Sequence, residues 1–326
     1  MIVIADERLA QPPTVSLSSS SRLPASLLAI TPEVSDALAV GRPVVALEST
    51  LITHGLPHPL ALDAARCAEG AVRAGGAVPA TIAVADGRIR VGLTSDELEA
   101  LAAEPAPWKV SRQNLAASLG RAGWSGTTVA ATMIAAHGCG IAVFSTGGIG
   151  GVHRGGGLSM DVSADLDELA RTPVAVVCAG PKSILDVPLT MEVLETRGVP
   201  VVGWGTDELA GFFSTGSGQP VPMRIDSAGE AAALARRHWT LGLGSGLLFA
   251  VPLPSHQGIP RDEMEAVIAR AEAEATRAGV FGSATTPWIL SRLAELTGGR
   301  TVAANLALIE NDARVAASLA VALRQA

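Results

Sequence analysis

Short apolar runs without intervening polar residues are the feature of this chain that most constrains its fold. The runs are rich in β-branched side chains and occupy residues 44–47, 81–84, 141–144, 174–178 and 200–202. A strand that is apolar on both faces is buried on both faces. Helical periodicity fills most of the intervals, at residues 60–73, 127–136, 165–170 and 190–196. The sequence therefore predicts an α/β fold of three layers, α/β/α, around a central and largely buried sheet.

One further strand makes the expected sheet mixed. Residues 88–91 follow the run at 81–84 across Asp86-Gly87, a dipeptide that favours a tight hairpin turn and hence an antiparallel pair. The C-terminal region is predicted to be helical. Gly279 caps a helix over residues 261–278, Thr286-Pro287 opens a second that Gly298 closes, and residues 304–323 form a third.

The N-terminal residues differ from the rest of the chain. Residues 1–29 contain a serine run and lack the basic start and continuous apolar stretch of a secretory signal. We expect a flexible leader over 1–29 and a single domain over 30–326.

Composition excludes several classes of partner. The chain has 326 residues, is 48% hydrophobic, and carries a formal charge of -7 with its arginines dispersed. That balance argues against nucleic acid, and no apolar run has the length of about 20 residues that a membrane-spanning helix requires. Cys67, Cys139 and Cys178 form neither a disulfide framework nor a metal-binding pair. We therefore expect a cytoplasmic protein with reduced cysteines that acts on a small molecule.

Lysine is rare in this chain. Among the 24 basic residues it occurs only as Lys109 and Lys182. An amine can lose its proton and attack a carbonyl, whereas a guanidinium stays protonated at physiological pH. The two lysines are therefore candidates for a function that needs an amine, although coding bias toward arginine is an alternative explanation.

Lys182 follows the apolar run at 174–178 across a Gly180-Pro181 turn. The carboxyl edge of such a strand is where α/β proteins usually place their site, and we expect a helix to begin at Ser183. Lys182 is thus a candidate nucleophile at a helix N-terminus. The alternative is a solvent-facing lysine paired with Asp186.

Glu48 directly follows the apolar run at 44–47. An acid at the carboxyl edge of a buried strand suits a general acid, since apolar neighbours favour the protonated form of a carboxyl group. The alternative is a glutamate that only bonds the loop at 53–59.

A glycine-rich segment covers residues 147–157. It is not a dinucleotide fingerprint, because His153 stands where the third glycine would fall, and no Gly-Lys-Ser/Thr follows for a P-loop. The segment can still present backbone N–H groups to a ligand, with His153 and Arg154 available for an anion. A purely structural loop is the alternative.

Asp161 and Asp165 precede a helical pattern. One can cap the helix while the other holds a hydrated cation, because Mg²⁺ or Mn²⁺ needs few protein carboxylates when water completes the shell. Plain capping explains the pair equally well.

Taken in order, these segments closely resemble the pseudouridine-5'-phosphate glycosidase family, also known through indigoidine-cluster proteins. The resemblance covers the chain from about residue 30 to its end and rests on long, unusual blocks. These blocks are residues 44–50, 54–59, 79–83, 109–112, 127–130, 144–155, 161–166, 176–186, 194–202 and 295–299.

The resemblance implies reversible cleavage of pseudouridine 5'-phosphate to uracil and ribose 5-phosphate, the reverse reaction being that of a hydro-lyase. It also implies a divalent cation, Mn²⁺ or another such as Mg²⁺, and a homotrimer. By matching motif, Lys182 corresponds to the nucleophile, Glu48 to the proton donor and Asp161 to the metal position. Lys109, Val129, Ser163, Ala164 and Asp165 match substrate-binding positions, and His153 and Asn305 match residues expected near the site.

The implied chemistry agrees with the argument from lysine. A uracil carbanion is a poor leaving group, so an oxocarbenium route with two carboxylates has little to offer. An imine between Lys182 and C1' of the sugar makes that carbon electron-poor and opens another route. The alternatives are another Schiff-base lyase of aldolase type acting on a sugar phosphate, and a non-catalytic ligand-binding protein.

The chain departs from the family pattern at two places. Gln113-Asn114 stands where relatives commonly have Arg-Asp, and Val251 stands where an asparagine begins an Asn-Pro-Ile-Pro pattern. The first departure bears on substrate binding beside Lys109. The second removes any hydrogen bond expected from that amide.

Overall fold

The computed structural model describes residues 23–55, 59–280 and 285–325. Most of the predicted leader, residues 1–22, lies outside the described residues. The chain that follows it is already structured before the boundary expected at residue 30. A 3₁₀ turn, η2 (Ala25–Leu27), leads into strand β1 (Leu28–Ile30), which pairs in parallel with β4 (Arg88–Val91).

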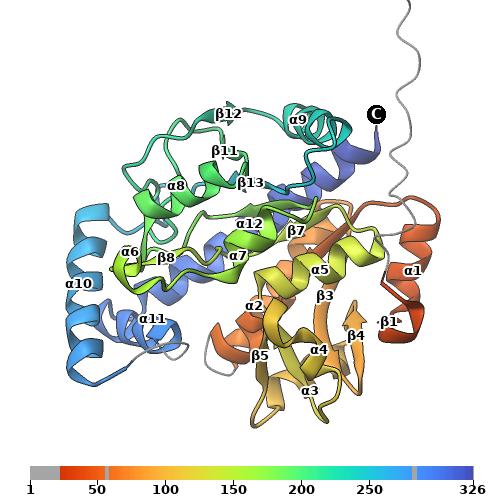
Figure 1. Ribbon diagram of the computed structural model, residues 1–326, viewed down its shortest axis with the longest axis horizontal. Coiled ribbons are helices and arrows are strands. Elements are labelled where there is room, and N and C mark those ends of the chain that lie inside the picture. Colours follow the sequence, from red (N-terminus) through yellow and green to blue (C-terminus); the bar gives the residue numbers. More distant parts are fainter. Residues whose placement is uncertain (1–22, 56–58, 281–284, 326) are drawn as a thin grey trace, which may run out of the picture.

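A mixed sheet of eleven strands runs through the molecule, as predicted (Figure 1). Its parallel centre has the order β2-β7-β9-β13-β11, and β3 forms antiparallel pairs with both β4 and β6. Asp86 and Gly87 both have positive φ in the turn between β3 and β4, which is the hairpin that the dipeptide predicts. The strands are β2 (Val44–Leu47), β3 (Val78–Ala85), β5 (Trp108–Val110), β6 (Ser125–Thr127), β7 (Val143–Ser145), β9 (Ala175–Cys178), β11 (Val201–Trp204), β12 (Met223–Ile225) and β13 (Leu247–Ala250).

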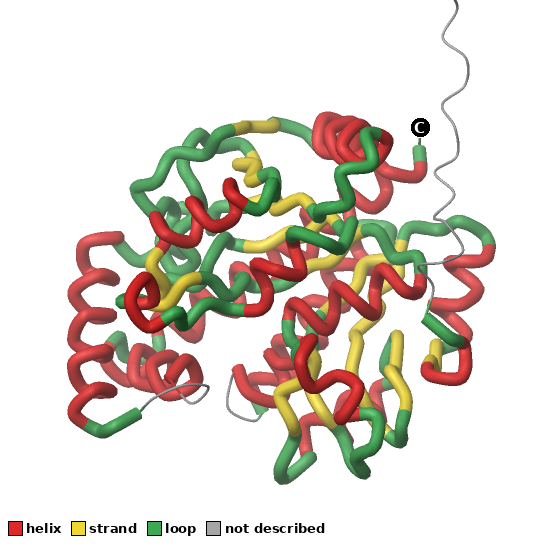
Figure 2. The backbone as a smooth tube through the Cα atoms, in the orientation of Figure 1, coloured by secondary structure: helices red, strands yellow, loops and turns green. Residues whose placement is uncertain are grey.

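Helices cover both faces of this sheet, so the structure has the predicted three layers (Figure 2). Val45 and Leu47 of β2 pack toward one face, whereas Val44 and Ala46 pack toward the other. That alternation of side chains, with apolar residues on both faces, explains why the strands carry no polar alternation. The first face is covered by α2 (Leu60–Ala74), α9 (Ala228–Thr240), α10 (Arg261–Arg277), α11 (Thr285–Leu296) and α12 (Arg300–Arg324), and the second by α1 (Pro32–Ala39), α5 (Val129–Cys139), α7 (Ala164–Leu169) and α8 (Val187–Thr196).

Short elements sit at the edges of the layers. Helix α3 (Ser95–Ala103) begins with a capping box in which Thr94 and Glu97 bond each other's backbone N–H groups. The other short elements are the π-helix η3 (Leu51–Gly55), the 3₁₀ turn η4 (Arg112–Asn114), α4 (Leu115–Ser118), β8 (Val152–His153), α6 (Gly156–Ser159) and β10 (Leu185–Asp186). Among the described residues, no helix combines the length and apolar character needed to cross a membrane.

One helix start was predicted wrongly. Residues 183–184 form a turn, β10 follows, and α8 begins at Val187, where the Asp186 side chain accepts a hydrogen bond from the Leu189 N–H. Asp186 is a stronger helix-start signal than Pro181, because its carboxylate satisfies a backbone donor that the first turn leaves free. Lys182 therefore lies in a turn and not at a helix N-terminus.

Candidate active site

Lys182 is held by the glycine-rich segment at the carboxyl end of β9. Its backbone N–H donates to the Ile149 carbonyl at 3.1 Å, and the Ile149 N–H donates to the Gly180 carbonyl at 3.1 Å. Gly180 has φ of +86°, a conformation that a side chain disfavours, and an added Cβ would lie 2.6 Å from the Ala210 carbonyl oxygen. These backbone contacts fix the position of the Lys182 backbone, from which its half-buried side chain extends.

Glu48 lies at the end of β2, and β7 runs between β2 and β9. We expected apolar neighbours around this carboxyl group, and that expectation was wrong. The Thr50 and Thr146 hydroxyls each donate to one of its two carboxylate oxygens. Both hydroxyls can rotate to accept as well as donate, so they hold the carboxyl group in place whether or not it carries a proton.

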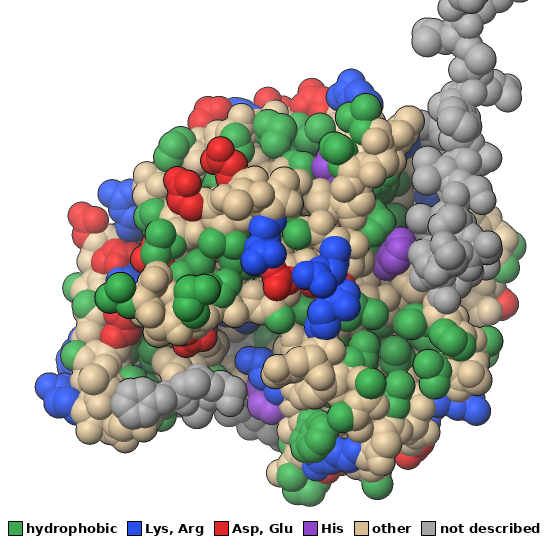
Figure 3. Space-filling model, viewed as in Figure 1, with side chains coloured by type: hydrophobic (Ala, Val, Ile, Leu, Met, Phe, Trp, Pro, Cys, Tyr) green, Lys and Arg blue, Asp and Glu red, His purple; other side chains and the backbone are tan. Residues whose placement is uncertain are grey.

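All of the predicted site residues line one cavity of about 730 Å³. Basic and histidine side chains are seen at the hollow between the part of the molecule that carries α11 and the part that carries β5 (Figure 3). The fold therefore brings together residues that lie far apart in the sequence. The predicted residues that line the cavity are Glu48, Lys109, Val129, His153, Asp161, Ser163, Ala164, Asp165, Lys182 and Asn305.

Lys109 lies on strand β5 and lines the same cavity as Lys182. The residue as a whole is exposed, but the protein atoms around its amine in the cavity still remove part of the hydration of that group. This desolvation lowers the pKa of the Lys109 amine. The positive charge of Lys182 lowers that pKa further, while Asp165 and Glu48 act in the opposite direction. The two lysines of the chain thus interact electrostatically across one cavity.

Asn114 explains one departure from the family pattern. Its side-chain oxygen accepts from the Ser111 N–H at 2.7 Å, and its side-chain nitrogen donates to the Lys109 carbonyl at 3.1 Å. An ionised aspartate could perform the first of these tasks but not the second, because it has no donor. Asn114 therefore fixes the backbone on both sides of Lys109.

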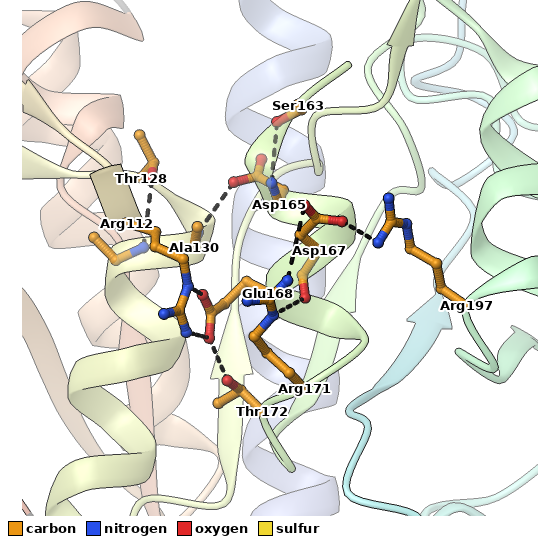
Figure 4. A network of polar contacts seen from close by, with 11 residues as sticks. Arg112, Thr128, Ala130, Ser163, Asp165, Asp167, Glu168, Arg171, Thr172 and Arg197 are labelled. Carbon is orange, nitrogen blue, oxygen red and sulfur yellow. Dashed lines mark hydrogen bonds and ion pairs between the residues drawn. The ribbon is translucent and has the colours of Figure 1, made fainter. Parts of the chain in front are cut away.

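Asp165 organises the part of the cavity wall that α7 forms. One carboxylate oxygen accepts from the Ala130 N–H at 3.0 Å in the first turn of α5 (Figure 4). The other accepts from the Gly150 N–H at 2.9 Å. The cap of α7 is Ser163, whose hydroxyl accepts from the Asp165 N–H at 3.2 Å, so neither aspartate is the cap that we considered. At Gly150 an added Cβ would lie 2.3 Å from the Ser163 hydroxyl, so only glycine permits this contact.

Sequence reasoning missed several residues that line the cavity. Phe212 has a positive φ of 61°, rare for a bulky residue, and its ring leaves no room for a Cβ at Gly148. His54 lies beside Lys109, and burial together with the charge of Lys109 lowers the pKa of its imidazole. His54 belongs to a motif already recognised, so its signal was available. Phe212 gave no sequence signal, because only tertiary packing places it there.

Asp161 is exposed at the cavity wall, in the turn between α6 and α7. Among the described residues, no group of three or more histidine, cysteine, aspartate or glutamate side chains is arranged to hold a metal ion. Asp165 has both oxygens engaged by backbone donors. The donor set therefore fits a cation held by one carboxylate and otherwise by water, which Mg²⁺ and Mn²⁺ accept.

Val251 marks the other departure from the family pattern. It is buried just after β13, where its N–H donates to the Cys178 carbonyl at 2.8 Å, and it packs with the core. Its side chain does not line the described cavity. At this position the side chain therefore contributes to the core and not to the lining of the described cavity.

The fold and the cavity together define an α/β enzyme with its site at the carboxyl edge of a mixed sheet. The chain belongs to the family described as indigoidine synthase A like protein, whose model matches residues 33–322. The family resemblance predicted from the sequence motifs is thereby confirmed.

Relatives extend across nearly the whole chain. A protein of Methylobacterium nodulans named pseudouridine-5'-phosphate glycosidase is 55% identical over 304 residues, which cover 93% of this chain and 90% of that protein. One of the same name from Paracoccus denitrificans is 54% identical, covering 91% of this chain and 98% of that protein.

Two solved structures share the fold. The prealnumycin C-glycosynthase AlnA, crystallised in complex with ribulose 5-phosphate, matches with a TM-score of 0.86 at 41% identity, covering 92% of this chain and 98% of the other. An indigoidine synthase A-like protein from Thermotoga maritima matches with a TM-score of 0.83 at 35% identity, covering 96% of this chain and all of the other.

Proposed function

We propose that this chain reversibly cleaves the C–C glycosidic bond of pseudouridine 5'-phosphate, giving uracil and ribose 5-phosphate through a covalent lysine intermediate. The observation that carries the proposal is the meeting of Lys182 and Glu48 in one cavity, in a chain more than half identical to proteins named for this activity. A nucleophile and an acid that face one cavity are what the imine route requires, and here they follow strands β9 and β2, which β7 separates.

The bond changes balance as follows. The neutral Lys182 amine attacks C1', the bond between C1' and the ring oxygen breaks, and Glu48 gives its proton to that oxygen. The attacking nitrogen, which now bears a positive charge, returns one proton to the Glu48 carboxylate. Its lone pair then forms a C1'=N bond while the bond to C5 of uracil breaks, and C5 takes that proton from Glu48. Water adds to C1' of the protonated imine and gives a proton back to Glu48, and the C–N bond then breaks to release ribose 5-phosphate and neutral Lys182. The net reaction consumes one water molecule.

The remaining cavity residues supply binding and orientation. We assign Lys109 and the backbone N–H groups of the glycine-rich segment to the phosphate and sugar hydroxyls, since ammonium and amide donors bind such oxygens. We assign Val129, Ser163, Ala164 and Asp165 to the substrate wall, and contacts with the sugar or base to His153 and Asn305, which line the same cavity.

Asp161 would hold a hydrated Mn²⁺ or Mg²⁺ at this wall. Such a cation, when bound, polarises its water ligands toward groups of the substrate. The chain's own part is to supply one exposed carboxylate at the cavity and to keep Asp165 engaged with backbone donors.

We further propose that residues 30–326 act as one unit, in the cytoplasm, as a homotrimer. Large apolar side chains are exposed on and beside α6, with Leu158 98% and Met160 79% exposed, and Leu189 of α8 is exposed next to them. Such a patch favours burial against another subunit. Light scattering on the purified protein should give the trimer mass, and a monomer mass would exclude this assembly.

The function is tested by incubating the protein with Mn²⁺, uracil and ribose 5-phosphate and following pseudouridine 5'-phosphate by chromatography. We expect product with the metal, little after chelation, and recovery when Mn²⁺ or Mg²⁺ is added back. Asp161→Asn should raise the metal concentration needed for half-maximal rate by about tenfold or more, because the only protein charge on the cation is removed.

The opposite direction separates the alternatives. Release of uracil from pseudouridine 5'-phosphate supports the glycosidase assignment. Imine trapping with sugar phosphates but no uracil release would instead support a Schiff-base lyase of aldolase type. Absence of both with folded, metal-loaded protein would reject the proposal.

A further inference from the structure

Glu168 is a fully buried carboxylate that the reaction described above does not use. Its side chain is 0% exposed and lies on α7, one turn after Asp165. Three donors fill its two oxygens: Nε and Nη2 of Arg112, the latter at 2.8 Å, and the Thr172 hydroxyl (Figure 4). A buried charge of this kind is costly to desolvate unless such partners surround it, and removing one partner is strongly destabilising.

Arg112 reaches Glu168 from the other wall of the cavity. It begins η4, three residues after Lys109, and the Asn114 side chain fixes the backbone of this segment at both Ser111 and Lys109. The guanidinium is 43% exposed and lines the cavity, whereas Glu168 does not line it. The hydrogen bonds to Glu168 raise the pKa of Arg112, so the guanidinium stays positively charged in this contact.

Helix α7 connects Glu168 to the rest of the substrate wall. Through Asp165 the same helix is bonded to the start of α5 and to Gly150 of the glycine-rich segment. Figure 4 shows Arg112, Glu168 and Asp165 as one chain of contacts from η4 through α7 to α5. The two-bond geometry between arginine and carboxylate fixes orientation as well as distance, which a single contact would not do.

We propose that Glu168 and Arg112 form a positioning pair that holds the Lys109 wall and the Asp165 wall of the cavity at a fixed separation. The inference rests on the proposed function, because its effect is on a substrate held between these walls. Arg112 faces the cavity and Glu168 acts through it. If one wall shifts relative to the other, C1' of the bound substrate moves away from its reactive position beside the Lys182 amine. A shift of about 1 Å can lower the rate about 100-fold.

The test is a double-mutant cycle on the full-length, metal-loaded protein with Glu168→Gln, Arg112→Gln and the double variant. We expect each single variant to lower kcat/KM by about 10- to 100-fold, and the double variant to be no worse than either. Arg112→Lys keeps the charge but loses the two-bond geometry, so it should behave like Arg112→Gln. Binding of ribose 5-phosphate, measured calorimetrically, gives a readout that does not depend on turnover.

Arg197→Gln is the matched control. Arg197 also pairs with an acidic residue of α7, Asp167, but both side chains are 41% exposed and Arg197 does not line the cavity. We expect its kinetic constants to stay within about twofold of the parent protein. A thermal melt of each variant separates loss of folded protein from loss of activity per folded molecule.

Three results would overturn the inference. If Glu168→Gln left kcat/KM unchanged while Arg112→Gln lowered it, Arg112 would bind the substrate directly and would not depend on Glu168 for its orientation. Additive losses would mean that the two residues act separately, and lower melting temperatures with unchanged kinetics and ribose 5-phosphate binding would mean a purely structural ion pair. A further outcome separates the two proposals. If the parent protein made no product but the double-mutant cycle showed non-additive losses in ribose 5-phosphate binding, the proposed function would be rejected and the positioning pair supported.

Discussion

Lys182→Ala should lower turnover of pseudouridine 5'-phosphate by a factor on the order of 10⁴ or more, because it removes the amine to which we assign the covalent bond to C1'. Borohydride added during turnover should reduce the imine and leave a stable adduct on the parent protein, and the variant should form none. Mass spectrometry of peptides is decisive here, since Lys109 is the only other lysine in the chain.

Two further variants make that result specific. Lys182→Arg keeps a cation at the same place and should be as inactive as Lys182→Ala, because a guanidinium is not a nucleophile at physiological pH. Lys109→Arg should weaken substrate binding but still form the adduct at residue 182. An adduct found on Lys109, or substantial turnover by Lys182→Arg, would remove the nucleophile assignment.

Asp312→Asn should stabilise the protein increasingly as the pH rises above the unfolded pKa of an aspartate, up to the raised pKa of the folded state. Asp312 lies on α12 with 0% of its surface exposed, and neither carboxylate oxygen has a hydrogen-bond partner among the described residues. Burial raises the pKa of this carboxyl group far above its usual range. The nearby Ala179 N–H lowers it only in part, because that N–H donates to the Gly147 carbonyl at 3.0 Å.

The sign follows from proton linkage. Between the unfolded pKa, about 3.9, and the raised folded pKa, the native state binds a proton that the unfolded state has lost. The free energy of unfolding therefore falls by about 1.4 kcal/mol for each pH unit in this window through Asp312 alone. Asparagine has no such proton, so the difference in stability between Asp312→Asn and the parent should grow with that slope.

Urea unfolding at several pH values and one protein concentration measures this difference. All other titrating groups are common to both proteins and cancel. Asp36→Asn, at an exposed position of α1, is the control and should give a difference that stays level with pH. Parallel curves for Asp312→Asn and the parent protein would show that Asp312 carries its charge inside the fold.

Much of the fold was predictable because each central strand is apolar on both faces. The runs at β2, β3, β7, β9 and β11 were recognised, and the hairpin at Asp86-Gly87 was confirmed. Strand β13 was missed although it lies between β9 and β11 in the sheet. It has four residues, and Gly242, Gly244 and Gly246 precede it, so local sequence gave no strand boundary.

The composition of the site was predictable for a different reason. Lysine is so rare in this chain, and the family motifs are so long, that the candidate residues could be named without a structure. Their surroundings could not be named. The Thr146 hydroxyl on Glu48, the backbone donors on Asp165 and the ring of Phe212 all come from distant segments.

The sequence by itself determined the layers, the sheet that is buried on both faces, the family and the pair formed by Lys182 and Glu48. These depend on periodicity and on residue chemistry, which are local properties of the chain. The tertiary structure alone decided that Lys182 lies in a turn, that β13 completes the sheet, and that Arg112 reaches Glu168 across the cavity wall. Strand order and side-chain contacts arise between residues distant in sequence, so no local pattern encodes them.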